Sequence, residues 1–504
     1  MTATPDGHGL PHLTRRQLIT GGAAGLAAIG AGAFGASRLL GGGDASPGAQ
    51  IGTHDYVRAF WSRPDLLPAP VSVSGGGVAP GYLSIGLGTA KGSVAGVQLV
   101  DHRGEPVFYQ PVSTRLWITN PGVFRHRGEP VLTWWEGSVR SPPGYGAGEG
   151  VIVDGSYREV ARVRAANGRS VDMHEYRLTP DGTALFTCYP EVVQADLSEI
   201  GGASNGRVLE NIIQEVDIRT GKLLMEWRSL DHVPISETYR KPADPLDYLH
   251  ANSIDIAADG NLLVSGRNTW AVYKLDRRTG EVIWRLGGKH SNFAMGKGSQ
   301  YSWQHHARAI DPTTISVFDN GADGATSSHS QSRGVLLSID EAARTVRLNA
   351  AYEHPDRLVA NAMGSVEKLP NGNVLIGWGE EPCATEFAAD GTRLSDAVFP
   401  VGQKSYRAFR LGWKGTPRNA PAIAARPGPT AGTSLLFVSW NGATEVTHWQ
   451  VHAGSSAKHL RPVGVLRRTG FETPVSLNTT QGYAAITALS SSGRPLGTSA
   501  TVRV

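Results

Sequence analysis

The sequence predicts an all-β protein, in which a six-bladed β-propeller is followed by a small C-terminal immunoglobulin- or fibronectin III-like β-sandwich. Strand–turn–strand units recur from about residue 95 onward, long helical periodicity is nearly absent, and the C-terminal part alternates as short strands. Glycine supplies 63 of the 504 residues, apolar residues make up 40% and charged residues 18%. This composition suits a chain with many turns and a large core, and it argues against disorder, collagen and coiled coil.

Residues 1–45 resemble an export signal followed by a linker. Arg15 and Arg16 directly precede a weakly hydrophobic, Gly/Ala-rich stretch that runs to Leu40, a pattern typical of twin-arginine signals. A membrane-spanning anchor is the alternative, but the many glycines and Arg38 disfavour a lipid-facing helix. We therefore expect an exported, extracytoplasmic protein, secreted or at the cell surface, that is a client of the twin-arginine export machinery. Whether the signal is cleaved or retained stays open.

Residues 46–416 contain the hairpin units of the predicted propeller. In each unit, Asp-Gly, Asn-Gly or Thr-Gly separates two short runs rich in Val, Ile, Leu and aromatic residues. Asp-Gly and Asn-Gly tolerate the positive φ that type I′ hairpin turns need. Repeated antiparallel hairpins over roughly 300 residues indicate a β-propeller, and we predict six blades with long insertions between them. The units comprise residues 99–110, 176–189, 215–227, 254–267, 274–288, 366–379 and 386–399.

The end of the chain is predicted to close the ring and then to form a separate module. Segment 405–413 reads SYRAFRLGW and is expected to pair beside the first blade as a last strand. Residues 417–429 form a Pro/Gly-rich linker, and residues 430–504 are expected to fold as an accessory β-sandwich with Trp440 and Trp449 in its core.

Charge and cysteine content exclude several classes of function. Lys and Arg total 48 against 44 Asp and Glu, and no long basic run occurs, so we expect no nucleic-acid partner. The two cysteines, Cys188 and Cys383, are too few for a disulfide framework or a four-thiolate zinc site. We expect both to be small buried hydrophobes rather than a bridge. The sequence does not indicate an oligomeric state.

Polar side chains occupy equivalent positions on several predicted inner strands. Because these strands face a shared channel, residues at equal offsets before each turn should lie at one level. Converging imidazoles there would suit an anion, metal or proton-transfer site, although a channel mouth is polar in any case. Four residues upstream of the last apolar residue of each strand stand His174, Asn252, His306 and Ser365, with His250 and His305 one or two positions further out.

A metal site is an alternative that the spacing disfavours. No H-x-x-x-H helix motif occurs, and the nearest acids, Asp172 and Glu175, lack ligand-like spacing. We therefore assign no metal ligands. No phosphate-binding Gly-rich loop precedes a helix either, since the segment 88–93 lies among strands and is interpreted as a turn.

Four segments of the chain resemble the bacterial arylsulfotransferases, and more closely the actinobacterial-type branch of that family. The resemblance covers about residues 75 to 415 and extends into the C-terminal sandwich. It implies a six-bladed propeller enzyme of the aryl-sulfate:phenol type, which moves a sulfuryl group by a ping-pong mechanism through a sulfohistidine, with neither a metal nor a nucleotide donor. The segments are DMHEYRLTPDG (172–182), LHANSIDIAADGNLLVSGR (249–267), EVIWRLGG (281–288) and WQHHAR (303–308).

The resemblance also implies roles for individual residues. His305 matches the family histidine that attacks sulfur, and His250 and Arg267 match the residues that hold the sulfuryl oxygens. His174 matches a further active-site histidine, and Asn252 a neighbouring polar contact. The implied substrates are a small aryl sulfate donor and a phenolic acceptor. Arginine suits this chemistry because its planar fork of donors can bind two oxygens of a sulfate ester.

Two departures from the family pattern leave alternatives open. His306 directly follows His305, so either imidazole can be the nucleophile, and we count His306 and Ser365 with Asn252 as substrate-binding candidates. The cysteine pair of enterobacterial members is not reproduced by Cys188 and Cys383, which are 195 residues apart.

Two other functions remain as alternatives from different classes. The first is a non-catalytic exported propeller that binds a cell-wall polymer or a protein partner, with Trp134 and Trp135 on its surface. The second is a quinone- or metal-dependent propeller oxidoreductase. Segments 290–302 and 322–332 are expected to be long loops over the channel that influence substrate choice.

Overall fold

The computed structural model describes residues 53–504, apart from residues 54, 89–93, 114, 142–143 and 479–480. The predicted export signal of residues 1–45 lies outside the described residues. The described chain is built from β-strands, nearly all of them paired antiparallel, with three short 3₁₀ helices, which confirms the all-β prediction. These helices are η2 (Ser198–Ile200), η3 (Ser229–Asp231) and η4 (Ile235–Glu237).

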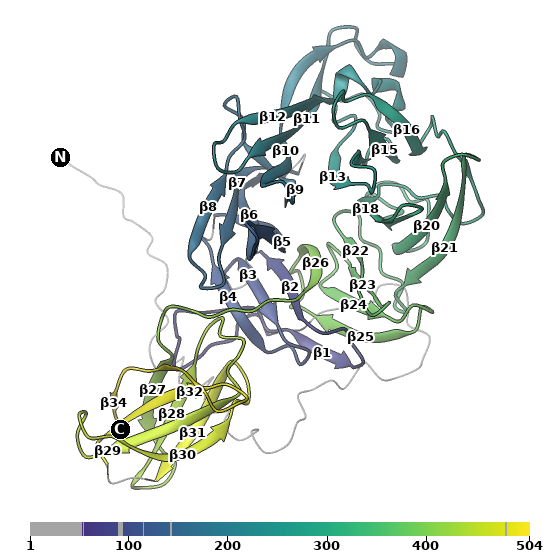
Figure 1. Cartoon of the computed structure of the whole chain (residues 1–504). Helices are drawn as coiled ribbons and strands as arrows, with labels where there is room; N and C mark the ends of the chain where they lie inside the picture. The colour runs from purple at the N-terminus through teal and green to yellow at the C-terminus, as the bar shows by residue number, and fades with distance from the viewer. Residues whose placement is uncertain (1–52, 54, 89–93, 114, 142–143, 479–480) are drawn as a thin grey trace, which may run out of the picture. The chain divides into compact units, whose positions relative to one another are not determined.

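Figure 1 shows five sheets of residues 72–411 arranged around a common centre, a propeller-like arrangement. Along the first sheet the order is β26 (Ser405–Leu411), β2 (Tyr82–Leu87), β3 (Gly96–Val100) and β4 (Pro106–Pro111). The second, eight-stranded sheet contains β5 (Trp117–His126), β6 (Glu129–Arg140), β7 (Tyr145–Val153), β8 (Glu159–Val163), β9 (Val171–Leu178), β10 (Thr183–Ala195), β11 (Gly206–Asp217) and β12 (Leu223–Arg228).

The other three sheets continue around the centre. One contains β13 (Ala251–Ile256), β14 (Leu262–Gly266), β15 (Ala271–Leu275) and β16 (Val282–Gly287). The next contains β18 (His305–Asp311), β19 (Thr314–Asp319), β20 (Arg333–Asp340), β21 (Thr345–Glu353) and the short β17 (Ala294–Met295). The last contains β22 (Ser365–Lys368), β23 (Val374–Gly377), β24 (Cys383–Phe387), β25 (Arg393–Val398) and β1 (Ser72–Gly75).

The eight-stranded sheet consists of two antiparallel halves. Strands β5–β8 form one half and β9–β12 the other, and β7 pairs with β9 at a single position, Gly148 opposite Val171. This junction brings the inner strands of the two halves, β5 and β9, toward the same centre.

Two strands from opposite ends of the ring close it. Strand β26 pairs with β2, from Tyr82 opposite Leu411 to Leu87 opposite Ser405, which confirms the role predicted for segment 405–413. Strand β1 pairs with β25 at the other end of the chain order, a second closure that the sequence reasoning missed. The first and last sheets therefore each contain a strand from the opposite end of the ring.

The predicted Asp-Gly and Asn-Gly turns are present, but their type differs from the expected I′. Gly182, Gly260 and Gly372 have φ of 77°, 84° and 92°, whereas the residue before each glycine is not left-handed. A type I′ turn needs positive φ at both central residues. A type I turn followed by a left-handed glycine fits instead, since each glycine N–H donates to the carbonyl three residues back, on Thr179, Ala257 and Leu369 respectively.

Strands of neighbouring sheets pack face to face, so some strands are covered on both surfaces. Trp134 and Trp135 of β6 show the effect: they are 4% and 0% exposed and belong to two different apolar clusters. The expectation that they form a binding surface is therefore wrong. Cys188 and Cys383 are free and buried, as predicted.

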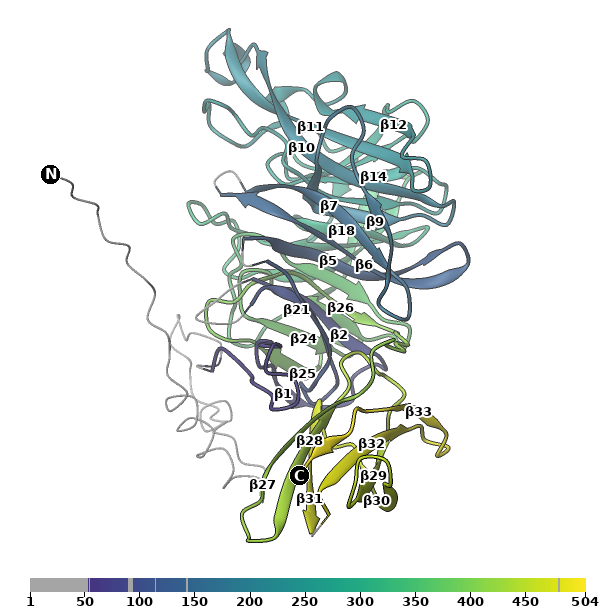
Figure 2. The same ribbon diagram turned by 90° about the vertical axis from the view of Figure 1, so that its left-hand side faces the viewer.

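The C-terminal residues form two further sheets around their own core. Figure 2 shows both sheets. Trp440 and Trp449, 6% and 0% exposed, lie in that core as predicted. One sheet contains β27 (Ala422–Pro427), β28 (Thr433–Ser439) and β31 (Glu472–Asn478), and the other contains β29 (His448–Gly454), β30 (Arg461–Arg467), β32 (Tyr483–Leu489), β33 (Pro495–Thr498) and β34 (Val502–Arg503).

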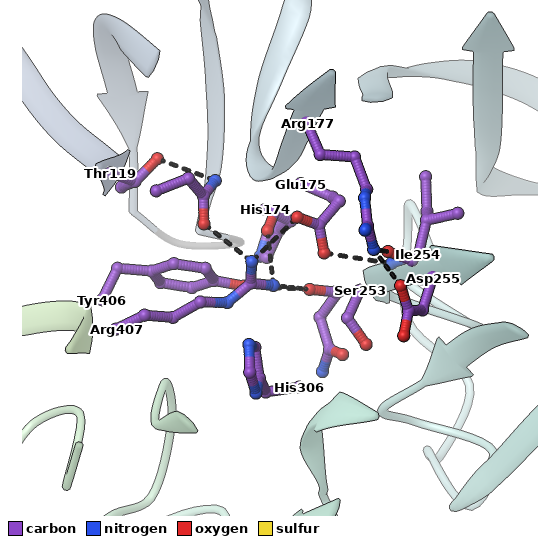
Figure 3. Close-up of polar contacts among 12 residues, drawn as sticks. Thr119, His174, Glu175, Arg177, Ser253, Ile254, Asp255, His306, Tyr406 and Arg407 are labelled. Carbon is purple, nitrogen blue, oxygen red and sulfur yellow. Dashed lines mark hydrogen bonds and ion pairs between the residues drawn. The ribbon is translucent and has the colours of Figure 1, made fainter. Parts of the chain in front are cut away.

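A buried arginine links the inner strands at the centre of the ring (Figure 3). Arg407 of β26 is 1% exposed, and its Nη1 donates to Asn120 Oδ1 at 2.8 Å and Glu175 Oε1 at 2.9 Å. Its Nη2 donates to the carbonyl oxygens of His174 and Asn252, both at 2.9 Å. One guanidinium on the closing strand thus contacts β5, β9 and β13.

Glu175 is the carboxylate partner that makes this burial possible. Its second oxygen, Oε2, accepts hydrogen bonds from Arg308 Nη2 at 2.6 Å and from the Ile254 N–H at 3.1 Å. Burial alone raises the pKa of Glu175, but Arg308, Arg407 and Arg177 outweigh it and lower that pKa to about 2. The pair is therefore ionised at neutral pH, and neither charge is left unpaired.

We predict that Arg407→Met lowers the free energy of unfolding by about 3–5 kcal/mol, because it leaves the Glu175 carboxylate buried beside fewer cations. Chemical unfolding followed by tryptophan fluorescence measures the effect. The exposed Arg347 of β21 provides the matched control, and Arg347→Met should change stability by less than about 0.5 kcal/mol. Equal stabilities of the two variants would contradict the role given to Arg407.

Candidate active site

Three of the histidines predicted to form the site lie together near the centre. His174 is on β9, His250 directly precedes β13 and His305 begins β18. The rings of His174 and His250 are 4.7 Å apart between centroids and nearly perpendicular, at 81°. The centre of the Tyr406 ring lies 5.7 Å from that of His174 and 6.4 Å from that of His305, so it neighbours both. All three histidines are buried, between 2% and 7% exposed.

Two of these histidines are paired with carboxylates. His174 Nδ1 lies 2.6 Å from Asp172 Oδ2, and His250 Nδ1 lies 2.5 Å from Asp247 Oδ2. The Tyr145 hydroxyl donates to Asp247 Oδ1 at 2.9 Å. In each pair Nδ1–H donates to the carboxylate, which leaves Nε2 as the nitrogen available to a substrate.

The carboxylate of Asp247 stays ionised beside a neutral His250. Burial raises the pKa of Asp247 by itself, but His250, the Tyr145 hydroxyl and Arg267 more than offset it, so the pKa is lowered. Burial lowers the pKa of His250, an effect that Asp247 counteracts only in part. This combination of a fixed carboxylate and a neutral imidazole is suited to accepting and returning a proton.

His305 has a different partner. Its Nδ1 lies 2.7 Å from the side-chain oxygen of Asn320, and its Nε2 accepts a long hydrogen bond, 3.3 Å, from the Met363 N–H. Burial, and after it the positive charge of Arg267, lower the pKa of His305 well below its usual range. His305 is therefore neutral at physiological pH, the state that a nitrogen nucleophile needs.

Arg267 follows β14, and its charge acts on His305 and on Asp247. Its direct hydrogen bonds among the described residues are to neutral oxygens. Nη1 donates to Asn268 Oδ1 at 3.0 Å and Nη2 to the Asn361 carbonyl at 2.9 Å. The guanidinium carbon lies 5.1 Å from the centre of the Trp303 ring. An arginine held by neutral groups and an aromatic face retains its charge for an anionic ligand.

The remaining candidates are placed differently. His306, 2% exposed, accepts a hydrogen bond from the Val366 N–H at Nδ1, and in the view of Figure 3 it lies on the opposite side of Arg407 from His174. Asn252 uses its side-chain nitrogen to donate to the Gln304 carbonyl at 2.6 Å. The Ser365 hydroxyl is engaged with the backbone of Ala408 at 3.1 Å, so it links β22 to β26 rather than facing the histidines.

Sequence reasoning missed several residues that organise the site. Asp172 lies two residues before His174, on the same face of a strand, so its pairing was detectable from spacing. Arg407 lies four residues before Leu411, the same offset that identified the other inner-strand positions, and was missed because the rule was not applied to the closing strand. Asp247 is in a loop and Asn320 directly follows β19, positions that periodicity does not reveal.

Two further observations concern the described residues only. They contain no group of three or more His, Cys, Asp and Glu side chains placed to hold a metal ion. Within the same part of the chain, no helix has the length and apolar character required to span a bilayer.

Comparison with known protein families identifies the group to which the chain is related. A family model described as Arylsulfotransferase (ASST) matches residues 123–399, more than half of the chain. The chain belongs to the arylsulfotransferase family. The matched region contains His174, His250, Arg267 and His305, but not the closing strand with Arg407. Membership supports a sulfotransferase-type enzyme.

Other comparisons are less informative. No curated protein matches the chain. Solved structures that resemble it include a Bacteroides caccae protein of unknown function, with 13% identity, 66% of this chain and 100% of that chain covered, and a TM-score of 0.38. The virginiamycin B lyase of Staphylococcus aureus shows 8% identity, 74% and 97% coverage and a TM-score of 0.34. For the Bacillus licheniformis GH43 protein BlXynB the identity is 8%, with 76% of this chain and 88% of that chain covered and a TM-score of 0.31. Similarity at this level carries no conclusion about this arylsulfotransferase-family protein.

The neutral buried histidines predict acid sensitivity of the fold. Burial lowers the pKa of His306 well below its usual range, so at pH below about 6.5 it binds a proton only after unfolding. Stability should therefore fall as the pH falls from 7 to 5. We predict that His306→Asn makes this decline shallower, by up to about 2 kcal/mol at pH 5.

Asparagine is the appropriate replacement because its side-chain oxygen can take the Val366 hydrogen bond and it tolerates the left-handed backbone at His306, where φ is 54°. Unfolding measured in denaturant at several pH values tests the prediction. The exposed His102 is the matched control, and in His102→Asn the free energy of unfolding should fall with pH as steeply as in the wild type. An equally steep fall in His306→Asn would contradict the prediction.

Proposed function

We propose that the protein transfers a sulfuryl group from a phenolic sulfate ester to another phenol by a ping-pong mechanism through a sulfohistidine at His305, with no nucleotide donor. One observation carries the proposal. The neutral His305 and the guanidinium of Arg267 converge on a single segment, where Arg267 donates to the Asn361 carbonyl and the Met363 N–H donates to His305. A nucleophile and an anion-binding fork are thus adjacent.

The positions of these groups suit complementary parts in the proposed reaction. A sulfate ester bound by Arg267 would present its sulfur to the lone pair on His305 Nε2. The Met363 N–H, already 3.3 Å from that nitrogen, can donate to a sulfuryl oxygen as the new bond forms. The phenolate, whose conjugate acid has a pKa of about 10, can leave as the anion. In the second half of the reaction, His174 or His250 can accept the proton of the acceptor phenol at Nε2 and release it afterwards.

His305 is favoured over His306 as the nucleophile. His306 accepts a hydrogen bond from the Val366 N–H at Nδ1 and lies near Arg308 and Arg407, the two arginines that pair with Glu175. His305 instead lies near Arg267, His250 and His174. A sulfate ester held by Arg267 would therefore be closer to His305.

We also propose finer features of the architecture and location. Counting the two halves of the eight-stranded sheet separately would make the ring a six-bladed propeller, with β26, β5, β9, β13, β18 and β22 innermost. The two C-terminal sheets would form a fibronectin III-like sandwich. The twin arginine supports export through the twin-arginine machinery. The family branch stays the actinobacterial type, on the resemblance alone.

We predict that His305→Ala abolishes both phenol release from an aryl sulfate and the appearance of one added sulfuryl group on the intact protein, because the accepting nitrogen is lost. His306→Asn should retain both. Intact mass after brief exposure to donor without acceptor measures the adduct. An adduct that persists in His305→Ala but disappears in His306→Asn would move the nucleophile to His306.

We predict that Arg267→Lys lowers kcat/KM for the aryl sulfate by at least about 10²-fold, because a single ammonium cannot replace a planar fork that binds two oxygens. Initial rates with a fluorogenic aryl sulfate and a phenol acceptor provide the measurement. Arg347→Lys, an exposed change of the same type, should keep the wild-type rate. Unchanged kinetics in Arg267→Lys would remove the anion-binding role.

A further inference from the structure

The three clustered histidines differ in the group that supports Nδ1. His174 and His250 are backed by carboxylates, at 2.6 and 2.5 Å, whereas His305 is backed by the neutral amide of Asn320 at 2.7 Å. A carboxylate can accept a proton from an imidazole, but an amide oxygen cannot hold one at neutral pH. The difference therefore concerns which imidazole can lose its Nδ1 proton during a reaction.

The orientation of the Asn320 amide is determined by its other partners. Its Nδ2 donates to two carbonyl oxygens, those of Ala360 at 2.8 Å and Met363 at 3.0 Å. A carbonyl oxygen and the amide oxygen are both acceptors and cannot hydrogen-bond to each other. The amide nitrogen must therefore face the two carbonyls, and Oδ1 must point to His305. Because Oδ1 only accepts, Nδ1 of His305 must carry the hydrogen and Nε2 must carry the lone pair. The Met363 N–H that donates to Nε2 supports the same tautomer independently.

The surroundings leave the amide no alternative position. Asn320 is fully buried. The Ser332 hydroxyl donates to the main-chain carbonyl of Asn320 at 2.7 Å and accepts a hydrogen bond from the Ala360 N–H at 2.9 Å. The end of β19 and the segment that supplies both carbonyls are thereby held together. The groups that face the His305 ring from other elements are Arg267, His250, His174 and Tyr406.

We propose that Asn320 is a positioning residue that retains the proton on Nδ1 of His305 through both halves of the reaction and so keeps the sulfohistidine reactive. The proposal rests on the proposed function. It explains why the residue beside Nδ1 of His305 carries an amide, whereas the residues beside Nδ1 of His174 and His250 carry carboxylates.

The bond changes show why the proton matters. In the first half, the Nε2 lone pair forms an N–S bond, the S–O bond to the aryl group breaks, and the phenolate leaves with that electron pair. The ring then bears the sulfuryl group on Nε2 and a hydrogen on Nδ1, so it is cationic. The negative sulfuryl group and the neutral amide stabilise this state without removing the proton.

In the second half, the acceptor oxygen loses its proton to His174 or His250 and attacks sulfur. The N–S bond breaks, its electron pair returns to Nε2, and His305 leaves as a neutral imidazole. Had Nδ1 lost its proton to a neighbouring carboxylate, the ring would have to leave as an imidazolate anion, which is a far poorer leaving group. Asn320 prevents that loss.

Asn320→Asp tests the proposal, because it replaces the amide by a carboxyl of nearly the same shape. We expect the burst of phenol release in the absence of acceptor to be retained, and the transfer from adduct to acceptor at pH 8 to slow by at least about 10²-fold. Transfer should recover as the pH is lowered toward 5 and the introduced carboxyl is protonated. Asn349→Asp, an exposed change on β21, is the matched control and should behave as wild type.

Other outcomes count against the proposal. Transfer at the wild-type rate throughout the pH range would overturn it, and so would equal losses in burst and transfer, which indicate a merely structural role. A wild type that forms no adduct overturns the proposed function itself, and this proposal with it. If Asn320→Asp does not fold, ¹⁵N spectra of the wild-type histidines at pH 8 decide: a hydrogen on Nδ1 of His305 supports the proposal, and a hydrogen on Nε2 overturns it.

Discussion

The buried ion pair between Arg407 and Glu175 is the interaction on which the rest of the structure depends. Arg407 reaches the centre only when β26 pairs with β2, and there it contacts the His174 carbonyl itself. The strand pairing that closes the ring therefore also positions the arginine that supports the histidine cluster. Removing one partner of a buried charge pair leaves the other charge uncompensated, which makes the central network sensitive to the loss of either Arg407 or Glu175.

The backbone is strained at three positions near the site. His250, His306 and Met363 have φ of 56°, 54° and 66°, values that non-glycine residues adopt rarely. Such conformations persist where surrounding contacts over-determine them. Here Asn320 donates to the Met363 carbonyl, and the imidazoles of His250 and His306 are held by Asp247 and by the Val366 N–H. The partners of the three imidazoles then differentiate them: two are suited to proton transfer and one to nucleophilic attack.

Much of this arrangement could be predicted from the sequence, because propeller strands repeat at regular offsets. The hairpin units, the closing strand and the inner positions of His174 and Asn252 follow from turn signals and spacing. Asp247 and Asn320 could not be found this way, since loops place them. The pairing of β1 with β25 depends on contacts more than 300 residues apart. Trp134 and Trp135 were misassigned as surface residues: consecutive residues of a strand point to opposite faces, and β6 is covered on both.

The central claim is that the sulfuryl group is bound to the protein between donor and acceptor. The configuration at sulfur tests this claim most directly, using an aryl sulfate whose three peripheral oxygens are distinct isotopes in a known arrangement. Two successive in-line displacements, first by His305 and then by the acceptor, predict net retention of configuration in the product. Net inversion would mean a single direct transfer between the two substrates and would contradict the account.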